Sequence, residues 1–114
     1  MNDMTTINPL DRALHTLETV LEDAADKRAR AEAMDERRKQ VRSALVVKYR
    51  GDGKGIGEAE HFAIADPAYL AAANEWEAAN YEYRRADAKA EAKRLSFDAW
   101  RTANATERAK MNMR

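Results

Sequence analysis

A seven-residue repeat runs through the second half of the chain. One position of the repeat is mostly aromatic and holds Tyr69, Trp76, Tyr83, Ala90 and Phe97. The position three residues later is mostly alanine and holds Ala72, Ala79, Ala86, Lys93 and Trp100. A repeat of this period is typical of a helix that packs along a second helix, and alanines let the two backbones approach closely. The sequence therefore predicts a coiled-coil-like pair with an alanine-rich seam.

Prolines and glycines indicate where the two helices begin and end. Asn8-Pro9 and Asp66-Pro67 each place a capping side chain before a proline, which is tolerated at the first helical position. All four glycines lie between Gly51 and Gly57, where the chain can turn. We expect a helix over about 9–49, a glycine hinge over 50–57, a short helix over about 58–65, a helix over about 67–103 and a C-terminal segment over 104–114.

These elements predict an all-α fold, an antiparallel two-helix hairpin in a single domain of 114 residues. The first helix carries leucines spaced by four, three and four residues, which predicts one packed face made of Leu10, Leu14, Leu17 and Leu21. A turn near residue 58 would set Val41 opposite Trp76 and Leu17 opposite Trp100. The blocks 1–25, 26–50, 51–83 and 84–114 alternate between negative and positive net charge, so antiparallel pairing sets opposite charges face to face.

Composition narrows the class of protein. Twenty basic and twenty acidic residues give zero net charge, and there is no cysteine for a disulfide or a thiolate metal site. No apolar run reaches the roughly 20 residues that cross a bilayer, and the first residues do not resemble a secretion signal. We expect a soluble, cytoplasmic protein that does not interact with a membrane.

No segment carries a complete catalytic or cofactor-binding motif. Lys54 is followed by Gly55, so the glycine-rich stretch lacks the hydroxyl of a phosphate-binding loop. Glu58 and His61 form only half of a di-iron motif, and Ser43 and Ser96 lie in helical patterns. The sequence predicts a protein that is not an enzyme, with no cofactor and no metal.

A protein-binding surface is the function that the sequence favours. The end of the chain is rich in bulky side chains, and Asn104 with Glu107 predicts a cap for a last short helix. A second heptad-spaced stripe contains Tyr81, Ala88 and Leu95. Tryptophan and arginine are common interface anchors, and methionine adapts to different partners. The candidate partner-binding residues are Trp100, Arg101, Phe97, Tyr81, Leu95, Met111 and Met113. The partner is another protein of unknown identity or a second copy in a homodimer, and it stays open whether the C-terminal residues belong to the core or to a docking surface.

Direct binding of nucleic acid is the alternative function. It would use the basic faces of the two helices, because phosphate contacts need clusters of arginine and lysine. The candidate residues are Arg37, Arg38, Lys39, Arg42, Arg84 and Arg85. Acidic neighbours such as Glu36 and Asp87 are interleaved with these residues, as in a solvated helix with many ion pairs.

The stretch "FDAWRTANATERAKMNMR", which follows a helix start "AEHFAIADPAYLAA", resembles small helical proteins encoded in bacteriophage genomes. The resemblance covers roughly residues 56–114. It implies an accessory role in phage DNA metabolism, or antagonism of a host protein, in the host cytoplasm. It implies no catalytic or binding residue.

Overall fold

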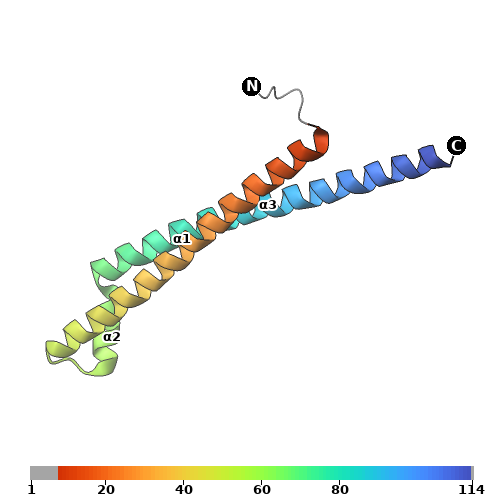
Figure 1. Ribbon diagram of the computed structural model, residues 1–114. Helices are drawn as coiled ribbons and strands as arrows, with labels where there is room; N and C mark the ends of the chain where they lie inside the picture. The colour runs from red at the N-terminus through yellow and green to blue at the C-terminus, as the bar shows by residue number, and fades with distance from the viewer. Residues whose placement is uncertain (1–7, 114) are drawn as a thin grey trace, which may run out of the picture. The chain divides into compact units, whose positions relative to one another are not determined.

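The computed structural model describes residues 8–113, which form three α-helices and contain no strand. In chain order they are α1 (Pro9–Gly51), α2 (Ile56–Ala65) and α3 (Pro67–Asn112) (Figure 1). The predicted all-α class is therefore confirmed. Within the described residues, no helix is both long enough and apolar enough to cross a membrane.

Both predicted helix starts are confirmed. The Asn8 carboxamide oxygen accepts a hydrogen bond from the Asp11 backbone N–H at 2.8 Å. Asp66 caps α3 in a similar way, since its Oδ1 accepts from the Ala68 backbone N–H at 2.8 Å. In each case the side chain satisfies an N–H group that has no partner inside the first turn.

The end of α1 shows why a glycine is needed between α1 and α2. The Lys54 N–H donates to the Tyr49 carbonyl at 3.2 Å, and the Gly53 N–H donates to the Arg50 carbonyl at 3.0 Å. This pair of bonds is a Schellman motif, which needs a left-handed residue just after the helix. Gly53 supplies it, with φ +92°. Gly51 ends α1 and Gly57 lies in α2, so the loop is shorter than the predicted span of 50–57.

The structure corrects the predicted end of the last helix. α3 continues to Asn112, so residues 104–112 are not a separate segment and Asn104 does not cap a new helix. The reason is local, because this stretch has neither proline nor glycine to stop a helix. The Thr106 hydroxyl also donates back to the Thr102 carbonyl of its own helix at 3.0 Å, so it does not compete with the helical backbone bonds. Arg114 lies outside the described residues.

The described chain divides into two compact units. Unit 1 consists of residues 8–25 and 85–113, and unit 2 consists of residues 26–84.

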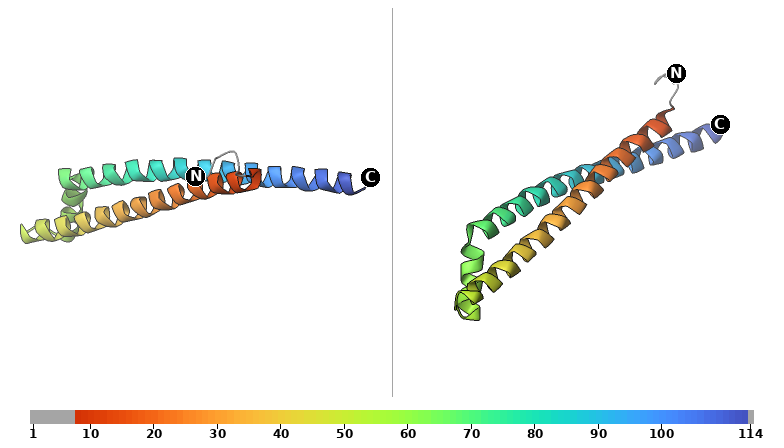
Figure 2. Two further views of the ribbon diagram at one scale, coloured as in Figure 1. Left: turned by 45° about the horizontal axis from the view of Figure 1, so that its top comes forward. Right: turned by 60° about the vertical axis from the view of Figure 1, so that its left-hand side comes forward.

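Unit 1 packs the first part of α1 against the second part of α3 (Figure 2). Its core is a cluster of small and aliphatic side chains made of Leu17, Val20, Ala24, Ala86 and Ala90. The predicted leucine face of α1 is therefore wrong, except at Leu17. Leu10, Leu14 and Leu21 remain 38–45% exposed. Leu14 follows the half-buried Ala13, and Leu21 follows the buried Val20. Both leucines therefore lie at the edge of the packed face of α1.

Unit 2 contains three helical segments, with α2 beside the end of α1 and the start of α3 (Figure 1). Its buried residues are all alanines, namely Ala31, Ala59, Ala63, Ala72 and Ala79. Ala59 and Ala63 of α2 have no exposed surface. Phe62, one residue before Ala63, is 43% exposed, although its ring lies 5.5 Å from that of Tyr49. The packed face of α2 is thus its alanine face.

The heptad positions of α3 are the ones that each unit protects from solvent. In unit 2 these are Tyr69, Ala72, Trp76, Ala79 and Tyr83, and in unit 1 they are Ala86, Ala90, Phe97 and Trp100. The exception is Lys93, which is exposed. The Arg38 guanidinium of α1 stacks 4.7 Å from the centre of the Trp76 ring. Leu17 and Trp100 border the same groove of unit 1.

Candidate protein-docking surface

In unit 1, α3 runs past the first residue of α1 (Figure 2). Pro9 and Trp100 line one groove, so the two helix segments lie side by side up to this point. Every described residue after Trp100 is exposed. The last three turns of α3 therefore present all their side chains to solvent; we call residues 101–113 the α3 end.

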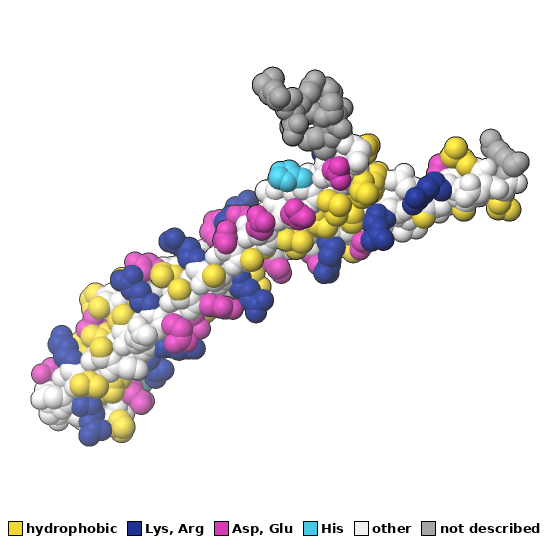
Figure 3. All heavy atoms as spheres, viewed as in Figure 1, with side chains coloured by type: hydrophobic (Ala, Val, Ile, Leu, Met, Phe, Trp, Pro, Cys, Tyr) yellow, Lys and Arg dark blue, Asp and Glu magenta, His cyan; other side chains and the backbone are white. Residues whose placement is uncertain are grey.

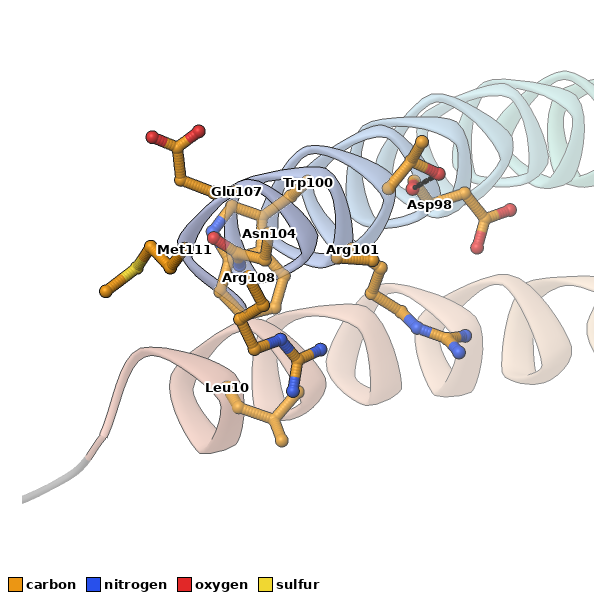
Figure 4. Close-up of a pocket in the computed structure, with 10 residues that line it drawn as sticks. Leu10, Asp98, Trp100, Arg101, Asn104, Glu107, Arg108 and Met111 are labelled. Atoms are coloured by element: carbon orange, nitrogen blue, oxygen red, sulfur yellow. Dashed lines mark hydrogen bonds between the residues drawn. The ribbon is translucent and has the colours of Figure 1, made fainter. Parts of the chain in front are cut away.

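A groove lies where α1 begins and the α3 end continues. Its lining includes Leu10, Trp100, Arg101, Arg108 and Met111. In Figure 4, Arg101 and Arg108 extend from α3 toward the start of α1, where Leu10 lies, and Glu107 points away on another side. The lining thus combines apolar side chains with two guanidinium groups and also includes the carboxylates of Asp98 and Glu107. The two guanidinium groups beside Leu10 suit a partner with apolar and acidic side chains.

Aromatic contacts support the inner edge of this groove. The rings of Phe97 and Trp100 lie 6.1 Å apart, and the Arg101 guanidinium lies 5.8 Å from the centre of the Phe97 ring. Both rings are half-buried. Trp100 also lines a second groove with Leu17, so its half-buried side chain borders two grooves of unit 1.

The outer side of α1 carries a stripe that sequence reasoning missed. Asp11, Leu14, Glu18 and Leu21 are spaced by three, four and three residues, so they share one face of the helix. We call these four residues the α1 stripe. All four are exposed, and Figure 3 shows hydrophobic side chains gathered over the first turns of α1. The packed face of α1 consists instead of Ala13, Leu17, Val20 and Ala24, whose spacing of four, three and four residues was also visible in the sequence.

The remaining predicted docking residues do not join the groove. Leu95 is 60% exposed and lies two residues from Phe97, on another side of α3. Met113 belongs to the α3 end and is 88% exposed. Tyr81 is exposed but belongs to unit 2. The predicted stripe of Tyr81, Ala88 and Leu95 is thus divided between the two units.

Carboxylates pair with most of the basic cluster that unit 2 carries on α1. Arg38 Nη2 lies 2.6 Å from Asp35 Oδ1, and its other terminal nitrogen donates to the Tyr69 hydroxyl at 3.0 Å. The hydrogen bond from Arg38 holds the pKa of Asp35 below its usual value. Lys39 lies 3.4 Å from the other Asp35 oxygen and 3.6 Å from Glu36.

The other basic candidates have varied surroundings. Arg37 forms an ion pair with Glu75 of α3 at 3.5 Å. Arg42 lines a groove that also contains Glu60. Arg84 and Arg85 are both exposed. Arg84 is the last residue of unit 2, and Arg85 is the first residue of the α3 segment of unit 1. Three of the six candidates, Arg38, Lys39 and Arg42, thus line one groove of unit 2, and Asp35 forms ion pairs with two of them.

No metal centre is assembled among residues 8–113. In that range no three side chains of the types that ligate metals lie close enough to hold an ion. Searches of protein-family models, of curated proteins and of solved structures give no match to this chain. The surface chemistry of unit 1 is therefore the basis for a functional proposal.

Proposed function

We propose that this protein is a non-enzymatic module that binds another protein through the α3 end. The surface would accept an amphipathic helix with apolar and acidic side chains. The observation that carries the proposal is the complete exposure of residues 101–113, which join Met111 and Met113 to Arg101, Arg108 and Lys110. Exposed apolar side chains beside cationic groups are typical of interaction sites.

The proposal includes an antiparallel, coiled-coil-like hairpin that turns at the glycine loop. Within unit 2, support comes from the cross-helix contacts of Arg38 with Tyr69 and Trp76. Within unit 1, support comes from the core in which Val20 and Ala24 of α1 join Ala86 and Ala90 of α3. A rigid helical scaffold of this kind would hold the α3 end in a fixed conformation for binding.

The biological setting remains a prediction from the resemblance to phage-encoded helical proteins. On that prediction, the module acts as a cytoplasmic accessory factor in DNA metabolism or antagonises a host protein. Its binding surface carries no catalytic group, so its effect on the partner would come from occupying a site.

Site-specific photocrosslinking tests the proposal. A photoreactive amino acid at position 105, between Arg101 and Arg108, should crosslink a partner in cells, whereas the same label at Lys89 should not. Mass spectrometry of the crosslinked peptide should identify an acidic, amphipathic helix. Purified partner should then bind the Arg101→Glu/Arg108→Glu variant at least tenfold more weakly than wild type.

A control variant separates this result from a general charge effect. Arg30→Glu/Lys89→Glu reverses the same number of exposed charges elsewhere and should bind the partner normally. Circular dichroism should show the same helical content for all three proteins. Equal binding by the wild type and the Arg101→Glu/Arg108→Glu variant would overturn the proposal.

Direct nucleic-acid binding is the alternative, and the adjacent exposed pair Arg84 and Arg85 favours it. The ion pairs of Arg37, Arg38 and Lys39 count against it, because each carboxylate competes with phosphate. Titrating labelled DNA and RNA at two salt concentrations by fluorescence polarisation separates the two functions. Binding that weakens steeply with salt, and that Arg84→Glu/Arg85→Glu abolishes, would favour the alternative.

A further inference from the structure

We propose that a second copy of this chain supplies the acidic amphipathic helix, so that the protein is a reciprocal homodimer. The α3 end of the first copy binds the α1 stripe of the second copy, and the α3 end of the second copy binds the α1 stripe of the first. This inference rests on the proposed function, because it names the partner of the same docking surface.

The two surfaces have complementary chemistry. The α1 stripe offers Leu14 and Leu21, which are 38% and 45% exposed, in alternation with the carboxylates of Asp11 and Glu18. The α3 end offers Met111, which is 69% exposed, beside Arg101 and Arg108. Leucine can pack against methionine while carboxylates approach guanidinium groups.

Their lengths also match. Residues 101–112 of α3 span about 18 Å at the rise of an α-helix, and the α1 stripe spans about 15 Å. One face can therefore cover the other over its whole length, and neither leucine of the stripe is left outside the contact.

Both surfaces lie on the same side of unit 1. Leu14 and Leu21 each follow a seam position of α1 by one residue. Arg101 follows the seam residue Trp100 by one residue, and Arg108 lies one heptad further along. In an antiparallel pair, the positions that follow the seam in this way flank it on one side. Figure 3 shows basic side chains along the edge of the hydrophobic area at the start of α1.

This placement allows a two-fold axis to bring each surface onto its complement. In a two-fold dimer the contact is reciprocal, so that the same pair of surfaces is buried twice. Charge selects this pairing over the two alternatives. Two α1 stripes facing each other would set carboxylates against carboxylates, and two α3 ends would set guanidinium groups against guanidinium groups.

Charge-reversed variants of the full-length chain test this arrangement. Variant A carries Arg101→Glu/Arg108→Glu. Variant B carries Glu18→Lys/Glu22→Lys, where Glu18 lies between the two leucines and Glu22 follows Leu21. Sedimentation equilibrium should give the wild type about twice the chain mass of 12.9 kDa and each variant alone the mass of one chain. An equimolar mixture of A and B should again give twice the chain mass, because each reversed surface then meets its opposite.

Arg30→Glu/Lys89→Glu should remain dimeric, and higher salt should weaken the wild-type dimer at least tenfold. A wild-type monomer, a variant A that stays dimeric, or a mixture that stays monomeric would each overturn the inference. A wild-type monomer that still forms the position-105 crosslink to a foreign protein would overturn only the homodimer and leave the proposed function standing.

Discussion

Units 1 and 2 use segments of the same two long helices but hold them in different ways. In unit 2, directional contacts join the helices: Arg38 reaches Tyr69 and Trp76, and the Tyr49 hydroxyl donates to Asp66 at 2.7 Å. In unit 1, the core is a cluster of alanines and aliphatic side chains around Val20. Directional contacts specify one register, whereas small apolar contacts specify it less strongly.

The units also differ in how many elements surround the core. α2 adds a third helical segment to unit 2 and buries Ala59 and Ala63 completely. Unit 1 contains two segments, and two helices can each bury only one face. It consequently leaves Leu10, Leu14 and Leu21 partly exposed. The difference explains why the candidate docking surface lies in unit 1.

Overpacking the two cores should give the largest effect. We expect Ala63→Leu in unit 2 to lower the free energy of unfolding by about 3 kcal/mol, the upper end for such changes. Ala90→Leu in unit 1 should cost about 1 kcal/mol, because its two segments can move apart. Urea denaturation monitored by circular dichroism measures both values.

An exposed alanine provides the control. Ala88→Leu adds the same atoms to α3 at a solvent-exposed position and should change stability by less than about 0.5 kcal/mol. A cost for Ala90→Leu equal to that for Ala63→Leu would show that unit 1 is as tightly enclosed as unit 2, and would remove the basis of the comparison.

Removing the central directional contact should have a smaller effect. Arg38→Leu abolishes the stacking on Trp76 and the hydrogen bond to Tyr69, while Asp35 keeps Lys39 at 3.4 Å. We expect a loss of about 1 kcal/mol, as for a partly exposed cation on an aromatic ring. In a Trp100→Phe background the emission of Trp76 should also shift.

The same substitution at an exposed arginine tests whether the contact is specific. Arg30→Leu should leave both the stability and the Trp76 emission close to wild type. If Arg38→Leu behaved like Arg30→Leu, the contacts of Arg38 would not help to set the register of unit 2, and the comparison with unit 1 would lose its main support.

The sequence predicted the features that depend on neighbouring residues. Asn8-Pro9 and Asp66-Pro67 contain both the cap and the first helical position, so the helix starts could be located. The heptad seam of α3 was also identifiable, because its aromatics and alanines differ sharply from their neighbours. The end of α3 was missed because a helix that nothing stops carries no signal of its own.

Features that depend on two segments at once were predicted less well. On α1, Leu10, Leu14, Leu17 and Leu21 looked like the packed face, but the register places Ala13 and Val20 there. The choice depends on which face α3 contacts, and α1 alone does not contain that information. For the same reason the sequence did not predict Leu14 and Glu18 as candidate docking residues. Trp100, Arg101 and Met111 were predicted, because residues of these types are common at interfaces wherever the helices pack.

The hydrogen bond between Tyr49 and Asp66 should give the smallest effect and a distinctive pH dependence. It holds the pKa of Asp66 below its usual value, with help from the Ala68 N–H, and raises the pKa of Tyr49. The Asp66 contribution exists above the unfolded pKa of about 3.9 and is lost as pH falls through the lower folded value. The Tyr49 contribution exists below about pH 10 and is lost as pH rises through the raised folded value.

Melting temperatures of Tyr49→Phe and wild type, compared across pH, measure this contact. The wild type should have the higher melting temperature near neutral pH. The difference in melting temperature should shrink at acidic pH and at strongly alkaline pH. Asp66→Asn should keep the cap of α3, since asparagine is an equally good capping residue, but lose the acid-side change. Tyr81→Phe removes a hydroxyl elsewhere on α3 and should show no such window. Equal melting temperatures for Tyr49→Phe and wild type at every pH would mean that the ring contact with Phe62, which both proteins keep, acts without help from the hydrogen bond. Unit 2 would then lose one of its directional contacts, while those of Arg38 would remain.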